Sequence, residues 1–231
     1  MFDISIKENL DIVNENIEKS LQRVGRTDKV NLIAVTKTMD LDIINEAIAA
    51  GAKDLGENKV QELSRKLDEL ENQANFHMIG HLQTNKVKYI FDRVKLIHSL
   101  DRSSLAKEID KRAKNMDINV DTLIQVNVAE EESKFGLKVD DVIPFIEKVL
   151  KYSNINIRGL MTMAPFVDDE MELRRIFRTM VDLKEKIAQQ NYKELSMDYL
   201  SMGMTNDYEI AIEEGSNMVR VGRAIFGKRN Y

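Results

Sequence analysis

The chain has 231 residues, of which 43% are hydrophobic and 32% are charged, and its formal net charge is −5. These values are typical of a globular protein, and charges of both signs are spread along the chain without a basic block, which argues against nucleic-acid binding. There is no cysteine, which excludes disulfides, thiolate metal sites and cysteine nucleophiles. No stretch has the apolar length of a signal peptide or of a membrane span, so we expect a cytoplasmic protein without a membrane partner.

The chain begins with an amphipathic pattern. Apolar residues recur at helical spacing from Leu10 to Val24 and predict a helix over residues 5–24. After it, strand-like and helix-like segments alternate. The predicted strands are Asn31–Val35, Ala52–Leu55, Asn75–Ile79, Val94–Ser99, Thr122–Val128, Ile157–Met163, Met197–Ser201 and Met218–Val221. The predicted helices between them are Leu41–Ala50, Lys59–Glu71, Ser103–Asn115, Val139–Lys151, Glu170–Gln190 and Asp207–Glu214.

Eight strands separated by helices in a chain of this length indicate an α/β protein, a single-domain (β/α)8 TIM barrel with an additional N-terminal helix. A doubly wound open sheet is the competing interpretation, because a sequence does not show closure. Asp40 is a candidate cap before one helix, and Gly51 is a candidate stop after it. The chain has only two prolines and no Gly/Ser linker, so we expect residues 1–231 to form one domain.

The stretch NLIAVTKTMD, residues 31 to 40, reads as a short buried strand that runs into a lysine. Strand alternation places Ile33, Val35 and Lys37 on one face. Lys37 is either a charge that reaches water at the strand's end or a lysine that reacts. In a barrel the chemistry gathers at the carboxyl ends of the strands, which favours the reactive lysine. Small, polar and glycine residues stand at the same predicted rim: Glu57, Asn58, Gly80, His81, Ser99, Asn127, Met163, residues 201–205, Gly222 and Arg223.

Two glycine-bearing stretches near the C-terminus predict an anion site. LSMGMTND follows the seventh strand with Ser201 and Thr205, and VRVGRAIFG follows the eighth strand with Gly222 and then a short helical piece. Backbone N–H groups at a helix start attract phosphate, glycine allows close approach, and a hydroxyl adds a donor. Each glycine alone would be read as a turn residue. Their joint position after strands seven and eight, where barrels bind phosphate, favours a phosphate site.

A lysine opposite a phosphate site suggests a phosphorylated aldehyde or ketone held as a Schiff base. Pyridoxal 5'-phosphate and a sugar phosphate in an aldolase both fit. Arg220 bears on this choice because it shares a strand face with Met218, not with Val219 or Val221, so it can point into the barrel. We interpret Arg220 as a donor to the cofactor ring nitrogen or phosphate; the alternative is a structural salt bridge across the barrel.

The chain resembles the pyridoxal phosphate homeostasis family, also called YggS/PROSC, over about residues 10 to 227. The motifs that carry the resemblance are LIAVTKT, GAKDLGENKVQE, FHMIGHLQTNKVK, VNVAEEESKFGL, IRGLMTMAPF, LSMGMTNDYEIAIEEGSNMVRVG and RAIFG. The family implies a barrel like the N-terminal domain of alanine racemase, with pyridoxal 5'-phosphate on the lysine of strand one. That lysine matches Lys37.

The resemblance also implies the other site residues. Asn58 and His81 match the pocket wall, with Met163 nearby. Thr205 stands where relatives usually have serine, and Gly222 with Arg223 matches the phosphate loop after strand eight, where many relatives have a hydroxyl residue in place of Arg223. The other two histidines, His77 and His98, have no role in the match, and no metal site is expected.

The family is regarded as non-catalytic, holding the cofactor and affecting vitamin B6 and amino-acid balance. We therefore expect no catalytic residues, and a small amino-acid racemase is the alternative. A racemase needs acid–base groups on both faces of its substrate, and the chain ends at Tyr231, shortly after strand eight, without room for a second domain. If Arg220 faces the ring nitrogen, it keeps that nitrogen unprotonated. The expected partners are pyridoxal phosphate and apo-forms of enzymes that use it, and we expect a monomer.

Overall fold

The chain folds into a closed barrel of eight parallel strands, which confirms the predicted architecture and excludes the open sheet. The computed structural model describes residues 5–70, 73–167, 169–192 and 195–227. Each strand pairs with its neighbour in chain order, and β1 pairs with both β2 and β8, which closes the barrel. The strands are β1 (Asn31–Val35), β2 (Asp54–Glu57), β3 (Asn75–Met78), β4 (Leu96–Leu100), β5 (Val120–Val126), β6 (Ile155–Thr162), β7 (Tyr199–Ser201) and β8 (Met218–Val221).

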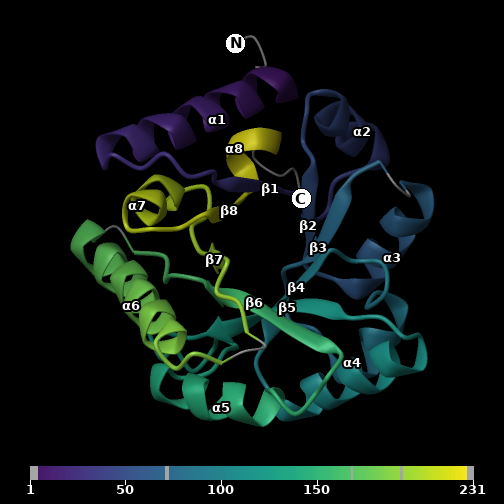
Figure 1. The fold of residues 1–231 in the computed structure, drawn as a ribbon. Helices are drawn as coiled ribbons and strands as arrows, with labels where there is room; N and C mark the ends of the chain where they lie inside the picture. Colours follow the sequence, from purple (N-terminus) through teal and green to yellow (C-terminus); the bar gives the residue numbers. More distant parts are fainter. Residues whose placement is uncertain (1–4, 71–72, 168, 193–194, 228–231) are drawn as a thin grey trace.

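Helices surround the strands on the outside of the barrel (Figure 1). The α-helices are α1 (Ile6–Arg23), α2 (Leu41–Ala49), α3 (Val60–Glu69), α4 (Ser103–Asn115), α5 (Val142–Val149), α6 (Glu170–Ala188), α7 (Tyr208–Glu213) and α8 (Arg223–Phe226). Two 3-10 helices accompany them, η1 (Thr84–Tyr89) and η2 (Val139–Asp141). The N-terminal helix α1 packs beside α7 and α8, and Asn9 Nδ2 donates to the Ile225 carbonyl at 2.9 Å. The additional helix therefore covers the barrel where its last strand meets its first.

Several predicted boundaries differ from the structure. β2, β4 and β7 begin two residues later than expected, β5 and β6 begin two residues earlier, and the predicted helix Val139–Lys151 starts as the 3-10 helix η2. η1 was not predicted, and the expected end of α3 at Glu71 lies outside the described residues. Asp40 does stand at the N-cap of α2, but its side chain accepts no capping hydrogen bond, so that part of the prediction is wrong. Gly51 follows α2 with φ at +107°, as a helix stop requires.

Alternation along the strands separates an outer from an inner apolar layer. Side chains such as Ala34 and Leu55 face the helices and belong to the main core. The inner layer fills the barrel interior and comprises Ile33, Leu96, Leu123, Met161 and Met218. Polar residues share the interior faces with it, among them His98 two residues after Leu96 and Arg220 two residues after Met218. The barrel interior is thus a packed core with a polar component.

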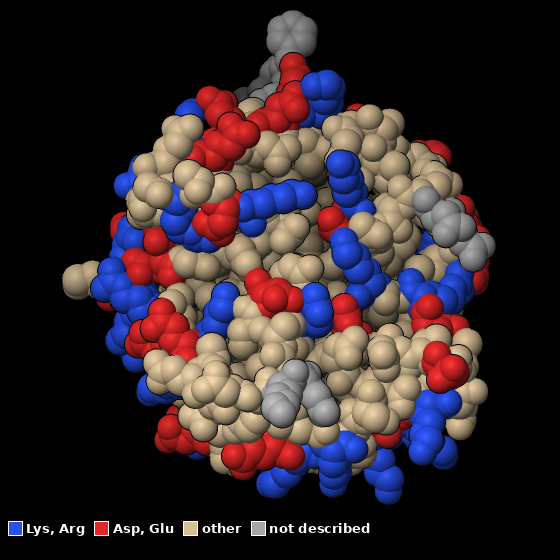
Figure 2. Space-filling model, viewed as in Figure 1, with Lys and Arg blue, Asp and Glu red and all other residues tan. Residues whose placement is uncertain are grey.

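Charges of both signs are interspersed across the face seen in Figure 2, without a large block of either. Among the described helices, none has both the length and the apolar character needed to cross a bilayer. The described ranges also contain no group of three or more His, Cys, Asp or Glu side chains placed to bind a metal ion.

Candidate functional site

A cavity of about 550 Å³ opens at the carboxyl ends of the strands. Eight of the nine residues predicted for the site line it: Lys37, Asn58, His81, Met163, Thr205, Arg220, Gly222 and Arg223. The ninth, Ser201, lies beneath the lining. Its side chain is fully buried, and its hydroxyl accepts a hydrogen bond from the lining residue Arg220. Residues from six strand ends thus meet around one space, as a closed barrel requires.

Lys37 follows β1 in a backbone segment that is held on both sides. The Thr36 hydroxyl donates to Glu57 Oε1 at 2.6 Å, and the Thr38 N–H donates to Glu62 Oε1 at 2.6 Å. Thr38 has φ at +66°, which is uncommon for a residue with a branched side chain. The two carboxylates therefore fix the backbone before and after Lys37, and this sets where its side chain enters the cavity.

Arg220 forms part of the cavity floor and is 4% exposed. Its Nη1 donates to the Ser201 hydroxyl at 2.6 Å and its Nη2 donates to the Thr162 carbonyl at 2.8 Å. Both acceptors are uncharged, so the structural salt bridge considered above does not account for this arginine. Burial lowers the pKa of Arg220 to about 10, while Asp207 opposes that effect, and the guanidinium remains a cation at neutral pH. The cavity floor therefore presents a fixed positive charge.

The loops after β7 and β8 lie side by side. The Gly222 N–H points to Thr205 Oγ1 at 3.4 Å, and Arg223 Nη2 donates to Asn206 Oδ1 at 3.2 Å. Gly203 has φ at +99°, and a Cβ there would lie 2.8 Å from Tyr208 Cα, so only glycine fits. These loops gather a hydroxyl and backbone N–H groups, the donor set that suits a phosphate.

His81 lies against the aromatic ring of Phe135, with ring centroids 3.7 Å apart and planes 19° apart. Its Nδ1 is 3.7 Å from Asp101 Oδ2, beyond hydrogen-bonding distance. Burial lowers the pKa of His81, Arg102 adds to this effect, and Asp101 opposes it. The imidazole is therefore a neutral wall of the cavity near pH 7.

Among the lining residues that were not predicted for the site, Phe135 and Asp207 bear on its chemistry. Phe135 lies in the motif VNVAEEESKFGL, but only the fold shows that the segment returns over His81. Asp207 is 7% exposed and accepts a hydrogen bond from the Met204 N–H; burial raises its pKa, and this hydrogen bond and Arg220 oppose the rise. The sequence placed Asp207 only at the start of a helix.

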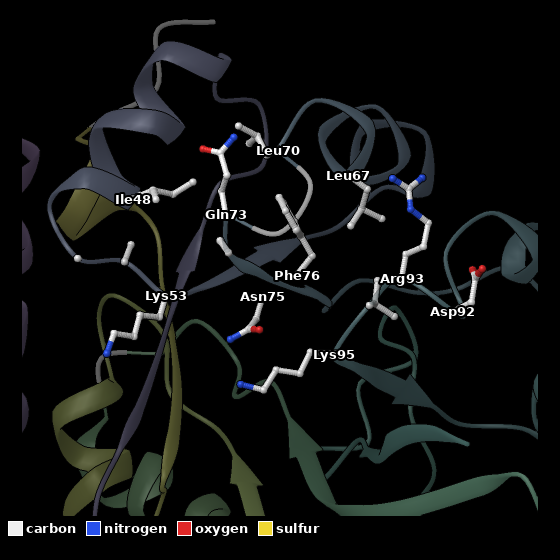
Figure 3. A pocket seen from close by; sticks show the side chains of 14 residues that line it. Ile48, Lys53, Leu67, Leu70, Gln73, Asn75, Phe76, Asp92, Arg93 and Lys95 are labelled. Atoms are coloured by element: carbon white, nitrogen blue, oxygen red, sulfur yellow. The ribbon is translucent and has the colours of Figure 1, made fainter. Parts of the chain in front are cut away.

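A second cavity, of about 770 Å³, lies at the other end of the barrel (Figure 3). Lys53, Asn75 and Lys95, which stand at or next to the starts of β2, β3 and β4, line it. None of the predicted site residues does. Residues at this end of a TIM barrel serve stability more often than chemistry. The cavity in Figure 3 is therefore not the candidate site.

Comparison with known proteins agrees with this geometry. The family described as "Alanine racemase, N-terminal domain" matches residues 9–230. A pyridoxal phosphate homeostasis protein of Aquifex aeolicus is 42% identical over 97% of this chain and 98% of its own length. The structure of PipY of Synechococcus elongatus with pyridoxal phosphate bound is 31% identical, with a TM-score of 0.85 over 96% of this chain and 100% of that chain.

An alanine racemase structure from Clostridium difficile has a TM-score of 0.72 at 13% identity, and this chain covers 57% of it. That likeness concerns the fold alone. The match to the family over nearly the whole chain, and the identity to full-length relatives, show that this chain belongs to the pyridoxal phosphate homeostasis protein family.

Proposed function

We propose that this chain binds pyridoxal 5'-phosphate as a Schiff base on Lys37 and takes part in pyridoxal phosphate homeostasis. The observation that carries the proposal is one cavity that contains Lys37, the Arg220 cation and the paired loops around Thr205 and Gly222. Among the described residues of the lining, Lys37 is the one lysine. The structure of PipY contains bound pyridoxal phosphate, and this supports the same ligand for the present chain. When bound, the cofactor supplies an aldehyde that condenses reversibly with amines.

The donors of the cavity fit the parts of this cofactor. The volume of about 550 Å³ lies in the range of small-molecule sites. The Thr205 hydroxyl and the backbone N–H groups of Gly222 and Arg223 suit the phosphate, since the last two stand at the start of α8. Arg220 suits the ring nitrogen as a donor. Asn58, His81 and Met163 form the wall, and Ser201 acts from below through Arg220.

The role that these groups support is binding rather than turnover, and we assign no catalytic residues. A guanidinium only donates hydrogen bonds, so Arg220 keeps a facing ring nitrogen unprotonated and limits carbanion stabilisation. His81 is stacked against Phe135 and neutral near pH 7, and Asp207 is engaged with the Met204 N–H. A small amino-acid racemase remains the second candidate because Lys37 itself is a competent acid–base group in such chemistry.

We further propose that residues 1–231 act as one pyridoxal phosphate-binding domain and as a monomer, with apo-forms of enzymes that use the cofactor as recipients. Apolar side chains stand exposed at the mouth of the cavity: Phe135 at 53%, Phe166 at 83% and Met204 at 36%. Exposed apolar residues that gather at the mouth of a binding site are typical of surfaces that contact other proteins.

The test is the absorption spectrum of the purified protein with pyridoxal phosphate, before and after borohydride reduction. We expect a visible band that reduction removes, and mass spectrometry should locate the reduced cofactor on the peptide that contains Lys37. The Lys37→Ala variant should be folded and colourless. A variant that keeps a reducible band, with the cofactor on another lysine, would overturn the assignment. A sugar-phosphate aldolase gives no visible band.

A further inference from the structure

A row of hydrogen-bonded side chains crosses the barrel interior from one end to the other. At the amino-terminal end of the strands, Asp54 Oδ1 lies 2.9 Å from Lys95 Nζ and 3.0 Å from His77 Nε2. His77 Nδ1 lies 3.0 Å from His98 Nε2, and His98 Nδ1 lies 3.1 Å from Ser201 Oγ. Arg220 completes the row through its bond to Ser201, 2.6 Å long. We call the row Asp54–His77–His98–Ser201–Arg220 the interior relay.

The interior relay lies where a barrel usually has apolar side chains. His77, His98 and Ser201 are each at most 1% exposed, and Arg220 is 4% exposed. A buried polar group without a partner costs several kcal/mol, so each member depends on its neighbours for hydrogen bonds. One end of the row lines a small opening between the strand starts, and the other end lines the candidate site. The two ends of the barrel are therefore connected through side chains.

The two ends of the relay allow only one set of hydrogen positions. An ionised Asp54 only accepts, so His77 Nε2 carries a proton and, in a neutral ring, His77 Nδ1 accepts. His98 Nε2 must then donate to His77, and His98 Nδ1 accepts from the Ser201 hydroxyl. The hydroxyl oxygen is left to accept from Arg220, which only donates. Every bond in the row is satisfied when both histidines are neutral and both carry the proton on Nε2.

The charges around the relay support this protonation state. Burial lowers the pKa of His77, although Asp54 opposes it, and burial lowers the pKa of His98 well below its usual range. Burial opposes ionisation of Asp54, but hydrogen bonds from His77 and Lys95 hold its pKa well below the usual range. At the site end Asp207 acts on Arg220, and Lys37, Glu170 and Arg223 line the same cavity. Lys95 and Asp121 line the opening at the other end beside Asp54.

We propose that Asp54, His77 and His98 are positioning residues for Arg220. They fix the Ser201 hydroxyl so that its oxygen faces Arg220, and the guanidinium is thereby held in the orientation that it presents to the cavity. A proton added to His77 would turn its Nδ1 into a donor, which forces His98 to donate to Ser201 instead. The Ser201 hydroxyl proton then loses its acceptor, His98 Nδ1, and the Ser201 oxygen must accept from both His98 and Arg220. Protonation of His77 at the far opening would in this way change the hydrogen bonds of Ser201, which contacts Arg220 at the candidate site.

The first test uses the full-length apo-protein and does not depend on a cofactor. The chain has three histidines, so ¹⁵N–¹H correlation spectra of their rings can be assigned with single His→Asn variants. We expect His77 and His98 to be neutral, with the proton on Nε2, at about pH 7. A His98 ring protonated on Nδ1, or a doubly protonated ring at that pH, would overturn the relay.

The second test measures the affinity for pyridoxal phosphate, and this consequence rests on the function proposed above. His98→Leu removes the acceptor of the Ser201 hydroxyl and should weaken binding roughly fivefold to tenfold, the loss of about one charge-assisted hydrogen bond. His98→Asn keeps an acceptor at the position of Nδ1 and should restore most of the affinity. Leu96→Val lies on the same inner face two residues earlier and serves as the matched control, with wild-type affinity.

The outcomes separate the two proposals. If the wild-type chain does not bind pyridoxal phosphate while the tautomers are as expected, the proposed function fails and the relay stands. If the wild-type chain binds and His98→Leu binds equally well, the positioning role fails. An equal loss of affinity in Leu96→Val would also overturn it, because the effect would then come from general core disruption.

Discussion

The Nζ atom of Lys66 lies 2.7 Å from Oε1 of Glu57, and neither side chain has any exposed surface. Lys66 occupies the buried face of α3, beside Leu63 and Leu67. Its Nζ also donates to Glu62 Oε1 at 2.7 Å and to the Thr36 carbonyl at 2.8 Å. All three donor positions of the ammonium group are therefore used. Lys66 therefore pairs with Glu57 and Glu62, the two carboxylates that accept hydrogen bonds from the residues on either side of Lys37.

Replacing Lys66 with methionine should lower the free energy of unfolding by about 3–5 kcal/mol, because it leaves Glu57 as an uncompensated buried carboxylate. Burial already raises the pKa of Glu57, so part of the loss is relieved when this group takes up a proton. Chemical denaturation of the apo-protein measures the change. The additional change Glu57→Gln should recover part of the stability.

The matched control is Lys7→Met, which removes a pair with Asp11 on the surface of α1. The side chains of that pair are 68% and 59% exposed, so the variant should differ from wild type by less than about 1 kcal/mol. Equal losses in the two variants would show that burial of the Lys66 pair is not the reason for its effect.

The loops around Thr205 and Gly222 should determine affinity for the phosphate group. A Cβ at Gly222 would lie 3.4 Å from Val35 Cβ, so alanine fits there, whereas Gly222→Leu adds a large side chain at a position that lines the cavity. We expect Gly222→Leu to weaken pyridoxal phosphate binding by on the order of tenfold or more, and Thr205→Ala to weaken it less. The measurement compares the affinity of each protein for pyridoxal phosphate with its affinity for pyridoxal, which lacks the phosphate. Equal affinity of wild type for the two ligands would contradict a phosphate site in these loops.

The sequence predicted the barrel and brought most residues of the candidate site to one rim because both depend on local patterns. Alternating elements give the closed topology, and a residue that follows a strand lies at the rim whatever the detailed packing. The interior relay depends instead on register between distant strands. His98 and Ser201 are 103 positions apart, and their contact exists because β4 and β7 face each other across the barrel. His77 and His98 therefore gave no signal in the sequence beyond that of buried histidines.

Lys66 shows a second limit of sequence analysis. A lysine in an amphipathic helix is normally placed on the solvated face. Position 66 lies on the apolar face of the helix that Val60, Leu63 and Leu67 define. A charge is stable there because Glu57 and Glu62 pair with it, and their positions are known only from the structure. The η1 helix escaped prediction because a 3-10 helix of six residues has no 3.6-residue apolar repeat.

Stability should fall as the pH is lowered from about 7 to about 5. In the folded chain the pKa values of His77 and His98 lie below the ordinary 6.5. Their contribution to the free energy of unfolding is therefore fully present when the pH is above the pKa of a histidine in the unfolded chain. It is lost as the pH falls, since the unfolded chain then binds protons that the folded chain does not. Each histidine contributes a slope of up to about 1.4 kcal/mol per pH unit. Denaturation at several pH values should show a smaller slope for His98→Asn and an unchanged slope for Leu96→Val.

The last prediction is that the loaded protein gives up its cofactor without racemising amino acids. The proposed Schiff base on Lys37 would exchange with amines, and the cavity opens at the barrel mouth beside the exposed Phe166. His81 and Asp207 are two titratable groups of the lining; His81 is stacked against Phe135, and Asp207 accepts a hydrogen bond from the Met204 N–H, which restricts both for acid–base work. NMR in deuterated water should therefore show slow or no exchange of the α-proton of alanine. Activity of an added apoenzyme should recover, also when a phosphatase destroys free pyridoxal phosphate. Rapid exchange with inversion would establish the racemase instead, whereas recovery only without the phosphatase would mean that the cofactor is released to solution rather than passed between proteins.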